Sequence, residues 1–384
     1  MLEKNEQVLN QIKKAKNILI AGYVPWNEEI IPSALALQLA LDKLGKKSEI
    51  ILETEKDKDY LKPSLEPFQN FPNFSKIKNR LDNLSDFVIS LDLSQAKIGK
   101  VKYKVTEKAL NFYITPQEGI FRNEDVSARN TNFKYDLIIT LGTPDLELLG
   151  ENYKQATEFF YQTPIINIDN QASNEEYGQI NLIDLTKPSM AEVIFSLFEE
   201  REEKYLDSEV SHCLLAGIIY KTHNFKTPVT PHTLSAAYNL ITWGADKEKI
   251  INQFYRSQSL NTFKLWGKAL NNLSQGEENS ALAWTTLLSQ DFRETETREY
   301  DLINLINELT INIPKIEIFT VFYGGEKKSN ALISARKNID LKNLFSAYSP
   351  AGNNKFLQIK TDKNLDEFKK EIIALLNQKL NSAS

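Results

Sequence analysis

The stretch NILIAGYVPWNEEIIPSALALQLALDKLGK, residues 17–46, joins a compact apolar run to a helical pattern through the loop GYVPWNEEIIP. Apolar residues follow one another before the loop, whereas Leu35, Leu39 and Leu44 recur near helical spacing after it. Strand, loop and helix in this order are typical of α/β proteins, whose ligand sites lie beyond the carboxyl ends of the strands. The loop has no glycine-rich run, no histidine and only two adjacent carboxylates. It is therefore either an unfamiliar active site or one whose chemistry has been removed.

Further runs of both kinds extend this pattern along the first half of the chain. Val8, Leu9 and Ile12 lie on one face of a short helix before the opening strand. The strand candidates that follow the opening segment are KSEIILET, FVISLDLS, ALNFYIT, YDLIITLGTPD and PIINIDNQ. Helical patterns such as DLELLGENYKQATEFFYQ separate some of them. Strands that alternate with helices predict a parallel sheet with helices on its faces.

The second half divides into a helical region and another α/β region. From about Lys187 to Leu273 the apolar spacing is helical, and the polar run SQGEENS follows. Beyond that run, ALAWTTLL, KIEIFTVFYG, NALISARK and FLQIKT predict strands, and EFKKEIIALLNQKL predicts a closing amphipathic helix. The 384 residues exceed the size at which one core keeps growing, about 250–300 residues. We expect two α/β domains with a cleft between them, residues 1–262 and 277–384, joined by a helix or linker over 263–276.

Composition describes an ordinary globular protein, with 41% hydrophobic and 25% charged residues. A net charge of −5 weakens a duplex-DNA function without excluding short oligonucleotides. The single cysteine, Cys213, has apolar neighbours, which predicts a small buried side chain in a reducing compartment. The N-terminus is charged from the third residue, and no apolar run approaches the ~20 residues that a membrane span needs. We therefore expect a cytoplasmic protein that is neither secreted nor anchored.

Four ordered segments resemble the motifs of one known family. The opening segment is similar to H-x-x-P-D-x-D-x-x-G-S-A-L-A-L, and YDLIITLGTPDLELLG is similar to I-x-L-D-T-P-D-x-x-x-L-G. PIINIDNQASNEEYGQINLID resembles P-x-I-N-I-D-H-H-P-S-N-x-x-F-G-x-I-N-L-V-D, and LLAGIIYKTHNF resembles L-L-x-G-I-I-x-D-T-G-x-F. These are motifs of the DHH phosphoesterase superfamily, which includes RecJ-like exonucleases, oligoribonucleases and cyclic-dinucleotide phosphodiesterases. The resemblance implies a parallel-sheet domain, a smaller DHH-associated domain and a site for two divalent cations, usually manganese, that activate water.

The first two segments depart from the family pattern at its metal ligands. Tyr23 stands where the pattern has histidine, and Asn27 and Glu29 stand at its two aspartates. Gly142 stands at the aspartate of the second segment, so a bridging carboxylate is missing there. Of these positions, only Glu29 carries an anionic side chain.

The other two segments depart in the same way. Asp169 keeps the first residue of the naming motif, but Asn170 and Gln171 replace both of its histidines. Lys221 occupies the aspartate position of the fourth segment. An ammonium and a divalent cation would repel one another strongly at such short range. We expect the side chains at all these positions to cluster, and Lys221 to pair with Glu29 or Asp169 in place of a metal.

The histidine inventory leads to the same conclusion without any alignment. The chain has three histidines, His212, His223 and His232, all within one helical stretch. A histidine-rich two-metal centre cannot draw its ligands from different loops with this inventory, and the spacings do not match a helical i, i+4 pair. We interpret them as surface or capping histidines.

The C-terminal region resembles the DHH-associated domain, in which a strand with S-x-R leads to a G-G-G-H-x-x-A-A-G loop. Ser334 and Arg336 survive, and Arg336 can contact a phosphate or a terminal base. Of the glycine-rich loop only Gly352 remains, and Asn353 matches its histidine. Side chains in such a loop obstruct the approach of phosphate to backbone amides. Possible ligand-binding residues are therefore Trp26, Ser33, Ser334, Arg336 and Asn353, although Tyr23 and Trp26 are also suited to fill the space that metals and water would occupy.

Three hypotheses follow from these residues. The leading one is an inactive DHH-type homologue, without catalytic residues or cofactor, that keeps a two-domain clamp for a nucleotide, a short oligonucleotide or a protein partner. The alternative is an active phosphodiesterase with manganese or magnesium held by Glu29, Asp145 and Asp169. The third is a structural subunit that pairs with an active paralogue.

Overall fold

The computed structural model describes residues 3–24, 27–53, 65–199, 203–227, 229–256, 259–276, 280–313, 315–336, 339–352 and 356–382. Two predicted ligand-binding residues, Trp26 and Asn353, lie outside these ranges. Within them, none of the helices has the length and apolar character that crossing a membrane requires.

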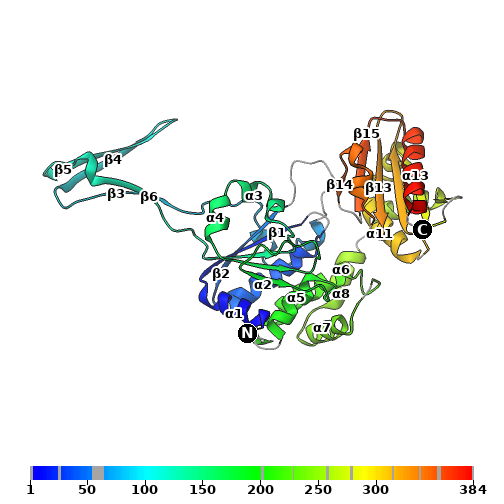
Figure 1. Ribbon diagram of the computed structural model, residues 1–384, viewed down its shortest axis with the longest axis horizontal. Helices are drawn as coiled ribbons and strands as arrows, with labels where there is room; N and C mark the ends of the chain where they lie inside the picture. The colour runs from blue at the N-terminus through cyan, green and yellow to red at the C-terminus, as the bar shows by residue number, and fades with distance from the viewer. Residues whose placement is uncertain are drawn as a thin grey trace.

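A five-stranded parallel sheet organises the N-terminal half and confirms the predicted fold class (Figure 1). Its strand order is β2-β1-β7-β8-β9. The strands are β1 (Asn17–Tyr23), β2 (Lys47–Glu53), β7 (Leu137–Leu141), β8 (Ile165–Asp169) and β9 (Ile180–Ile183). Every residue of β7 and β8 is buried, as expected for central strands covered on both faces. The carboxyl ends of β1, β7 and β8 carry three of the four family-like segments to one edge of the sheet, and the fourth segment lies at the end of α6 (Ser208–Lys221).

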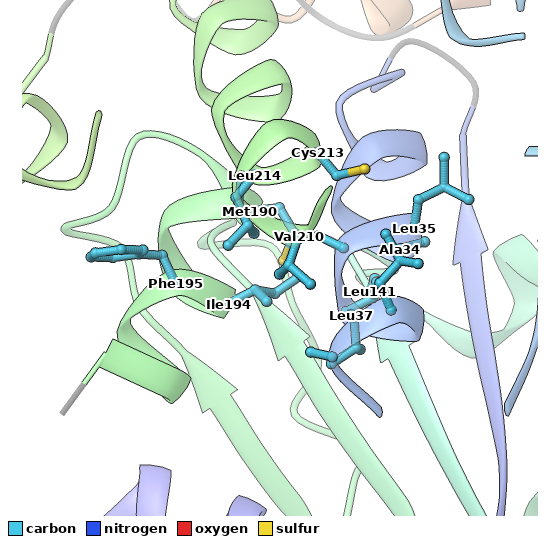
Figure 2. Close-up of a cluster of buried hydrophobic side chains, with 14 of the residues drawn as sticks. Ala34, Leu35, Leu37, Leu141, Met190, Ile194, Phe195, Val210, Cys213 and Leu214 are labelled. Carbon is cyan, nitrogen blue, oxygen red and sulfur yellow. The ribbon is translucent and has the colours of Figure 1, made fainter. Parts of the chain in front are cut away.

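Helices cover both faces of this sheet. The larger core includes α1 (Lys4–Lys14), α2 (Ile30–Lys43), α5 (Met190–Glu199), α6 (Ser208–Lys221), α7 (Pro231–Thr242) and α8 (Lys247–Tyr255). The smaller core on the other face includes α3 (Glu151–Lys154) and α4 (Thr157–Gln162). Figure 2 shows side chains of α2, α5 and α6 in the larger core, with Cys213 among them. Cys213 is fully buried, which confirms the prediction made from its apolar neighbours.

Two predicted strands form, but outside the parallel sheet. FVISLDLS contains β3 (Phe87–Leu91), which pairs antiparallel with β6 (Val126–Asn130). ALNFYIT contributes to β5 (Leu110–Glu118), which pairs antiparallel with β4 (Lys97–Val105). No α-helix lies between β3 and β6 to make the crossover that a parallel pair needs, so the chain folds back locally. These two ribbons, residues 87–130, project from the body of the protein and are called the arm below (Figure 1).

The C-terminal half forms a separate six-stranded mixed sheet of order β10-β11-β12-β13-β15-β14. Its strands are β10 (Ser274–Gln275), β11 (Leu282–Leu288), β12 (Ile318–Gly324), β13 (Ser329–Ala335), β14 (Ala351–Gly352) and β15 (Phe356–Thr361). One face packs against α9 (Leu260–Asn271) and α11 (Leu302–Asn312), beside α10 (Ser289–Thr295). The other face packs against α12 (Leu341–Leu344) and α13 (Leu365–Ser382). The cleft and the domain boundaries stay predictions, although α9 packs on this second sheet through Leu265 and Ala269.

Candidate functional site

An ammonium–carboxylate pair lies at the carboxyl end of β1. Helix α6 ends at Lys221, whose Nζ lies 2.7 Å from Glu29 Oε1 in an ion pair poorly aligned for a hydrogen bond. The same ammonium donates to Asn27 Oδ1 at 3.0 Å. The other oxygen of Glu29 accepts from the backbone N–H of Met190, the first residue of α5, at 3.0 Å. Glu29 is therefore held by a cation and by a helix N-terminus, and the expected ion pair with Lys221 is present.

Burial is the largest influence on the pKa of Glu29. The residue is 1% exposed, and burial raises the pKa of its carboxyl above the ordinary value, while the charge of Lys221 acts in the opposite direction. The Lys221 side chain is 38% exposed, so its ammonium keeps part of its hydration. A buried pair of this kind contributes little net stability, but the loss of one partner leaves the other charge without compensation.

A carboxylate at the position of Gly142, where the family pattern has aspartate, would require Ile30 to move. Its φ of +53° lies in the left-handed region that side chains rarely adopt. A Cβ placed there would lie 2.6 Å from Ile30 Cδ1 and 3.2 Å from Asn27 Nδ2. The space in which an aspartate side chain would begin is therefore occupied by Ile30, the first residue of α2.

Asp169, the retained acidic residue of the naming motif, organises the loop after β8. Its Oδ1 accepts from the backbone N–H groups of Asn170 at 2.7 Å and Gln171 at 3.2 Å, and its Oδ2 accepts from Asn174 Nδ2 at 2.7 Å. Asp169 is fully buried, and this burial raises the pKa of its carboxyl against the opposing effect of these hydrogen bonds. Asn170 Nδ2 donates to the carbonyl of Lys187 at 3.0 Å. Both residues thus serve the backbone around them.

A network of neutral polar side chains lies behind Asp169, and the sequence analysis did not identify it. Asn167 Nδ2 donates to Asn174 Oδ1 at 2.7 Å and to Asn181 Oδ1 at 3.1 Å. The hydroxyl of Tyr177 lies 2.8 Å from both Thr140 Oγ1 and the carbonyl of Thr143. Asn167 and Thr140 interrupt otherwise apolar strands, and this interruption is the sequence signal that could have predicted a buried polar network.

Direct contacts join some of the predicted site residues. Lys221, Asn27 and Glu29 meet, and Gly142 lies beside Asn27. The backbone N–H of Tyr23 donates to Thr143 Oγ1 at 3.2 Å, which ties the end of β1 to the segment that contains Gly142. In the described part of the chain Lys221 pairs with Glu29 and not with Asp169.

The remaining predicted residues lie in structural positions. Ser33 is fully buried, and its hydroxyl donates to the carbonyl of Glu29 at 2.8 Å. Asp145 caps a short 3₁₀ turn by accepting from the N–H of Glu147 at 2.9 Å. In the C-terminal sheet Ser334 is 6% exposed, whereas Arg336 is exposed and donates through Nε to the carbonyl of Thr310 at 2.7 Å.

The turn after α6 carries backbone strain next to Lys221. His223, Asn224 and Phe225 have φ values of 47°, 58° and 63°, so three consecutive residues other than glycine adopt the left-handed conformation. His223 stands where the family pattern T-G-x-F has glycine. Strain of this kind persists only where the surrounding structure imposes it, and it is frequent at functional sites.

These donors do not fit the two-metal centre that the family resemblance implies. Gly142 offers no ligand, Glu29 is paired with a lysine, and Asp169 already accepts three hydrogen bonds. Across the ranges that the structure describes, no three or more histidine, cysteine, aspartate or glutamate side chains are grouped to hold a metal ion. This includes the alternative set of Glu29, Asp145 and Asp169.

Comparison with known proteins identifies relatives for part of the chain. No family model matches. The bifunctional oligoribonuclease and PAP phosphatase NrnA of Bacillus subtilis is 30% identical over 156 residues, which are 40% of this chain and 48% of that protein. NrnA of Thermus thermophilus is 26% identical over 112 residues, 29% of this chain and 34% of that protein. The matches thus span about half or less of the length of these curated relatives.

A solved structure resembles the fold along almost the whole chain. An exopolyphosphatase-related protein from Bacteroides fragilis has a TM-score of 0.70 at 14% identity, with 98% of this chain and 96% of that chain covered. Together these likenesses support the DHH phosphoesterase superfamily assignment that the sequence motifs predict. Within this DHH-type fold, the loops that resemble the family's ligand segments are those that hold Lys221, Glu29, Gly142 and Asp169.

Proposed function

We propose that this protein is a catalytically inactive DHH-type homologue that binds a nucleotide, a short oligonucleotide or a protein partner. The observation that carries the proposal is the Lys221 ammonium, 2.7 Å from Glu29 and 3.0 Å from Asn27. A covalently attached cation there neutralises the carboxylate that a metal would otherwise use. It also opposes the entry of a divalent ion, because two positive charges at such distances repel by several kcal/mol even at an effective dielectric constant of about 20.

The packing around Gly142 supports the same proposal independently. A bridging carboxylate at this position needs space for a Cβ, and Ile30 Cδ1 fills that space. Two-metal hydrolysis depends on several ligands that act as a unit to activate water and to stabilise charge at phosphorus. With one position filled by an apolar side chain and another by an ammonium, no single substitution restores that unit.

The proposed ligand class follows from the relatives and from the retained cation of the second sheet. The two NrnA proteins are named for oligoribonuclease and PAP phosphatase activities. Arg336 is exposed near the end of β13, where a guanidinium is suited to bidentate contact with phosphate. This combination favours a phosphate-bearing ligand over a neutral one.

The alternative function is a phosphodiesterase with a remodelled metal site, and the third is a subunit of an assembly with an active paralogue. The retained Asp169 and the acidic Glu29 at a family aspartate position favour the alternative. Against it, both carboxyls already have partners, and burial raises the pKa of each. A raised pKa weakens a carboxylate as a metal ligand, because only the deprotonated form binds the ion.

The test is hydrolysis of short oligoribonucleotides and of PAP by the purified protein with manganese, magnesium or cobalt, beside a binding titration with the same compounds. We expect binding without turnover above a buffer blank. Turnover that disappears in Asp169→Ala would contradict the inactive reading and support the remodelled site. Turnover that Asp169→Ala leaves unchanged would instead point to a contaminating enzyme or to an unrelated site. Failure to bind any of these compounds, with binding to a protein partner instead, would leave inactivity intact but overturn the phosphate-bearing ligand.

A further inference from the structure

The outer ribbon of the arm carries an exposed apolar row. Directly opposite residues in an antiparallel pair share a face, and alternate residues along each strand share it too. The register of β4 and β5 therefore gathers these pairs into one row: Val101 with Ile114, Tyr103 with Phe112, and Val105 with Leu110. Tyr103 is 71% exposed and Val105 is 68% exposed, so the row faces solvent.

The opposite face of the same ribbon is basic. Lys100, Lys102 and Lys104 alternate with the apolar residues of β4 and therefore point the other way. Register shifts on both sides of Ile98 keep the pair Ile98–Pro116 in phase with the apolar row. From the pair Val101–Ile114 to the pair Val105–Leu110 the ribbon is thus two-faced, with no charged residue in its apolar row.

The ribbon nearer the body continues this pattern. In β3 and β6 the residues Phe87, Ile89 and Leu91 lie opposite Asn130, Ala128 and Val126, which gives a second row that is largely apolar. Of the 22 large apolar side chains that are exposed in the described part of the chain, 12 lie between residues 87 and 130. The exposed apolar surface is therefore concentrated in the arm.

Such a surface requires a cover. An isolated two-stranded ribbon is marginally stable in water, and stable ribbons pack their apolar face against another layer. The exposed fractions of Tyr103 and Phe112, 71% and 49%, correspond to roughly 250 Å² for these two side chains together. A standard interface buries about 800 Å² on each partner, so these two side chains supply only part of that area and their exposed apolar neighbours in the arm are needed as well.

We infer that the apolar face of the arm packs against the same face of a second copy of this chain. The charge distribution supports a second copy, because Lys100, Lys102 and Lys104 lie on the opposite face, away from the apolar row. Two identical apolar rows can therefore meet about a two-fold axis without opposing like charges, and the lysines stay in water. This inference does not rest on the proposed function.

The test compares two tyrosines of the same ribbon that lie on opposite faces. Tyr103 belongs to the apolar row, whereas Tyr113 is 56% exposed and lies opposite Lys102 on the basic face. Sedimentation equilibrium across a wide concentration range should give a dimer for the full chain. Tyr103→Asp should weaken the dimer at least about tenfold in Kd, whereas Tyr113→Asp should leave it unchanged. Circular dichroism and thermal unfolding verify that both variants stay folded.

Several outcomes would overturn this inference. A full chain that stays monomeric at every concentration removes its basis, and equal effects of the two substitutions would show that the apolar row is not the interface. A dimer that Tyr103→Asp and Val105→Lys both leave intact would place the contact elsewhere. A monomer that binds a short oligonucleotide through Lys100, Lys102 and Lys104 would assign the arm to nucleic acid instead.

Discussion

Lys221 and Glu29 stand at two positions where the family pattern has metal ligands. In this protein they form an ion pair, so their charges compensate one another. Glu29 is 1% exposed, so its carboxylate depends on Lys221 and on the N–H of Met190 for compensation. The two interactions anchor the loop before α2 to the end of α6 and to the start of α5. At this scale the residues that stand at the ligand positions of the family pattern contact one another.

Lys221→Met should destabilise the protein by about 3 kcal/mol, because it leaves a buried charge without its partner. Burial already raises the pKa of Glu29, and removal of the ammonium raises it further. A raised pKa in the folded state gives stability that is present at low pH and is lost as the pH rises through that pKa. The destabilisation measured by urea unfolding should therefore be larger at pH 8 than at pH 5.

Lys226→Met is the matched control for this substitution. Lys226 pairs with Glu308 at 3.0 Å, but the two side chains are 42% and 34% exposed. A solvent-exposed pair of this kind contributes about 0–1 kcal/mol. Equal losses for the two variants would show that Lys221 does not compensate a buried carboxylate.

Gly142→Asp should destabilise the protein and should not restore hydrolysis. A residue other than glycine with φ near +53° costs about 1–2 kcal/mol in backbone strain, and its Cβ meets Ile30 Cδ1 at 2.6 Å. A double-mutant cycle with Ile30→Ala separates the two causes, because the second substitution relieves the contact and leaves the strain. A Gly142→Asp variant as stable as the parent would contradict the packing described for this position.

At the scale of elements, the edge of the parallel sheet is tied to its neighbours by Glu49 of β2. Lys134 and Lys78 both pair with this carboxylate. Burial acts to raise the pKa of Glu49, but hydrogen bonds from Lys134 and Lys78 outweigh it and lower that pKa to about 2. The two lysines lie on either side of the arm in sequence, so the contact holds the base of the arm to the sheet.

Glu49→Gln should reduce the acid sensitivity of the protein. A carboxyl whose pKa falls from 4.5 in the unfolded chain to about 2 in the folded one contributes stability above the unfolded value, and this is lost as the pH falls toward 2. The parent should therefore lose more stability than Glu49→Gln between these two pH values. Unfolding midpoints measured across this interval check the difference, and parallel curves for the two proteins would contradict it.

The sequence pattern was sufficient to predict the strands and helices whose residues are consistently buried. β7 and β8 are buried throughout and read as unbroken apolar runs, and α2 was predicted from its leucine spacing. The pattern did not distinguish these strands from β3 and β5, because an apolar run does not specify which sheet or partner will cover it. The alternation of lysine with Val101, Tyr103 and Val105 marks a two-faced ribbon, but its pairing depends on a turn and two register shifts.

For the candidate site, sequence comparison supplied the positions but not their contacts. That Lys221 pairs with Glu29 rather than Asp169 depends on where α6 ends relative to α2. That Ile30 fills the space beside Gly142 depends on tertiary packing, which no local pattern specifies. The asparagine network around Asp169 lay within the quoted motifs, yet its role emerges only when β8 and β9 pair.

The whole molecule combines two α/β units of a phosphoesterase-like fold. The candidate site lies in the first unit, where the Lys221 ammonium pairs with Glu29. The N-terminal unit is built on a parallel sheet and the C-terminal unit on a mixed one. The arm is a third feature, joined to the first unit through β3 and β6. The DHH-type fold is present, and we propose that the groups at the family's metal-ligand positions satisfy one another in place of metal ions.

Equilibrium binding of manganese, followed by the electron paramagnetic resonance signal of the free ion, tests this central claim most directly. We expect no stoichiometric binding to the purified protein at neutral pH, and the same result for Asp169→Ala, because Lys221 and Ile30 occupy the positions that a two-metal centre requires. Stoichiometric binding that disappears in Asp169→Ala would contradict it.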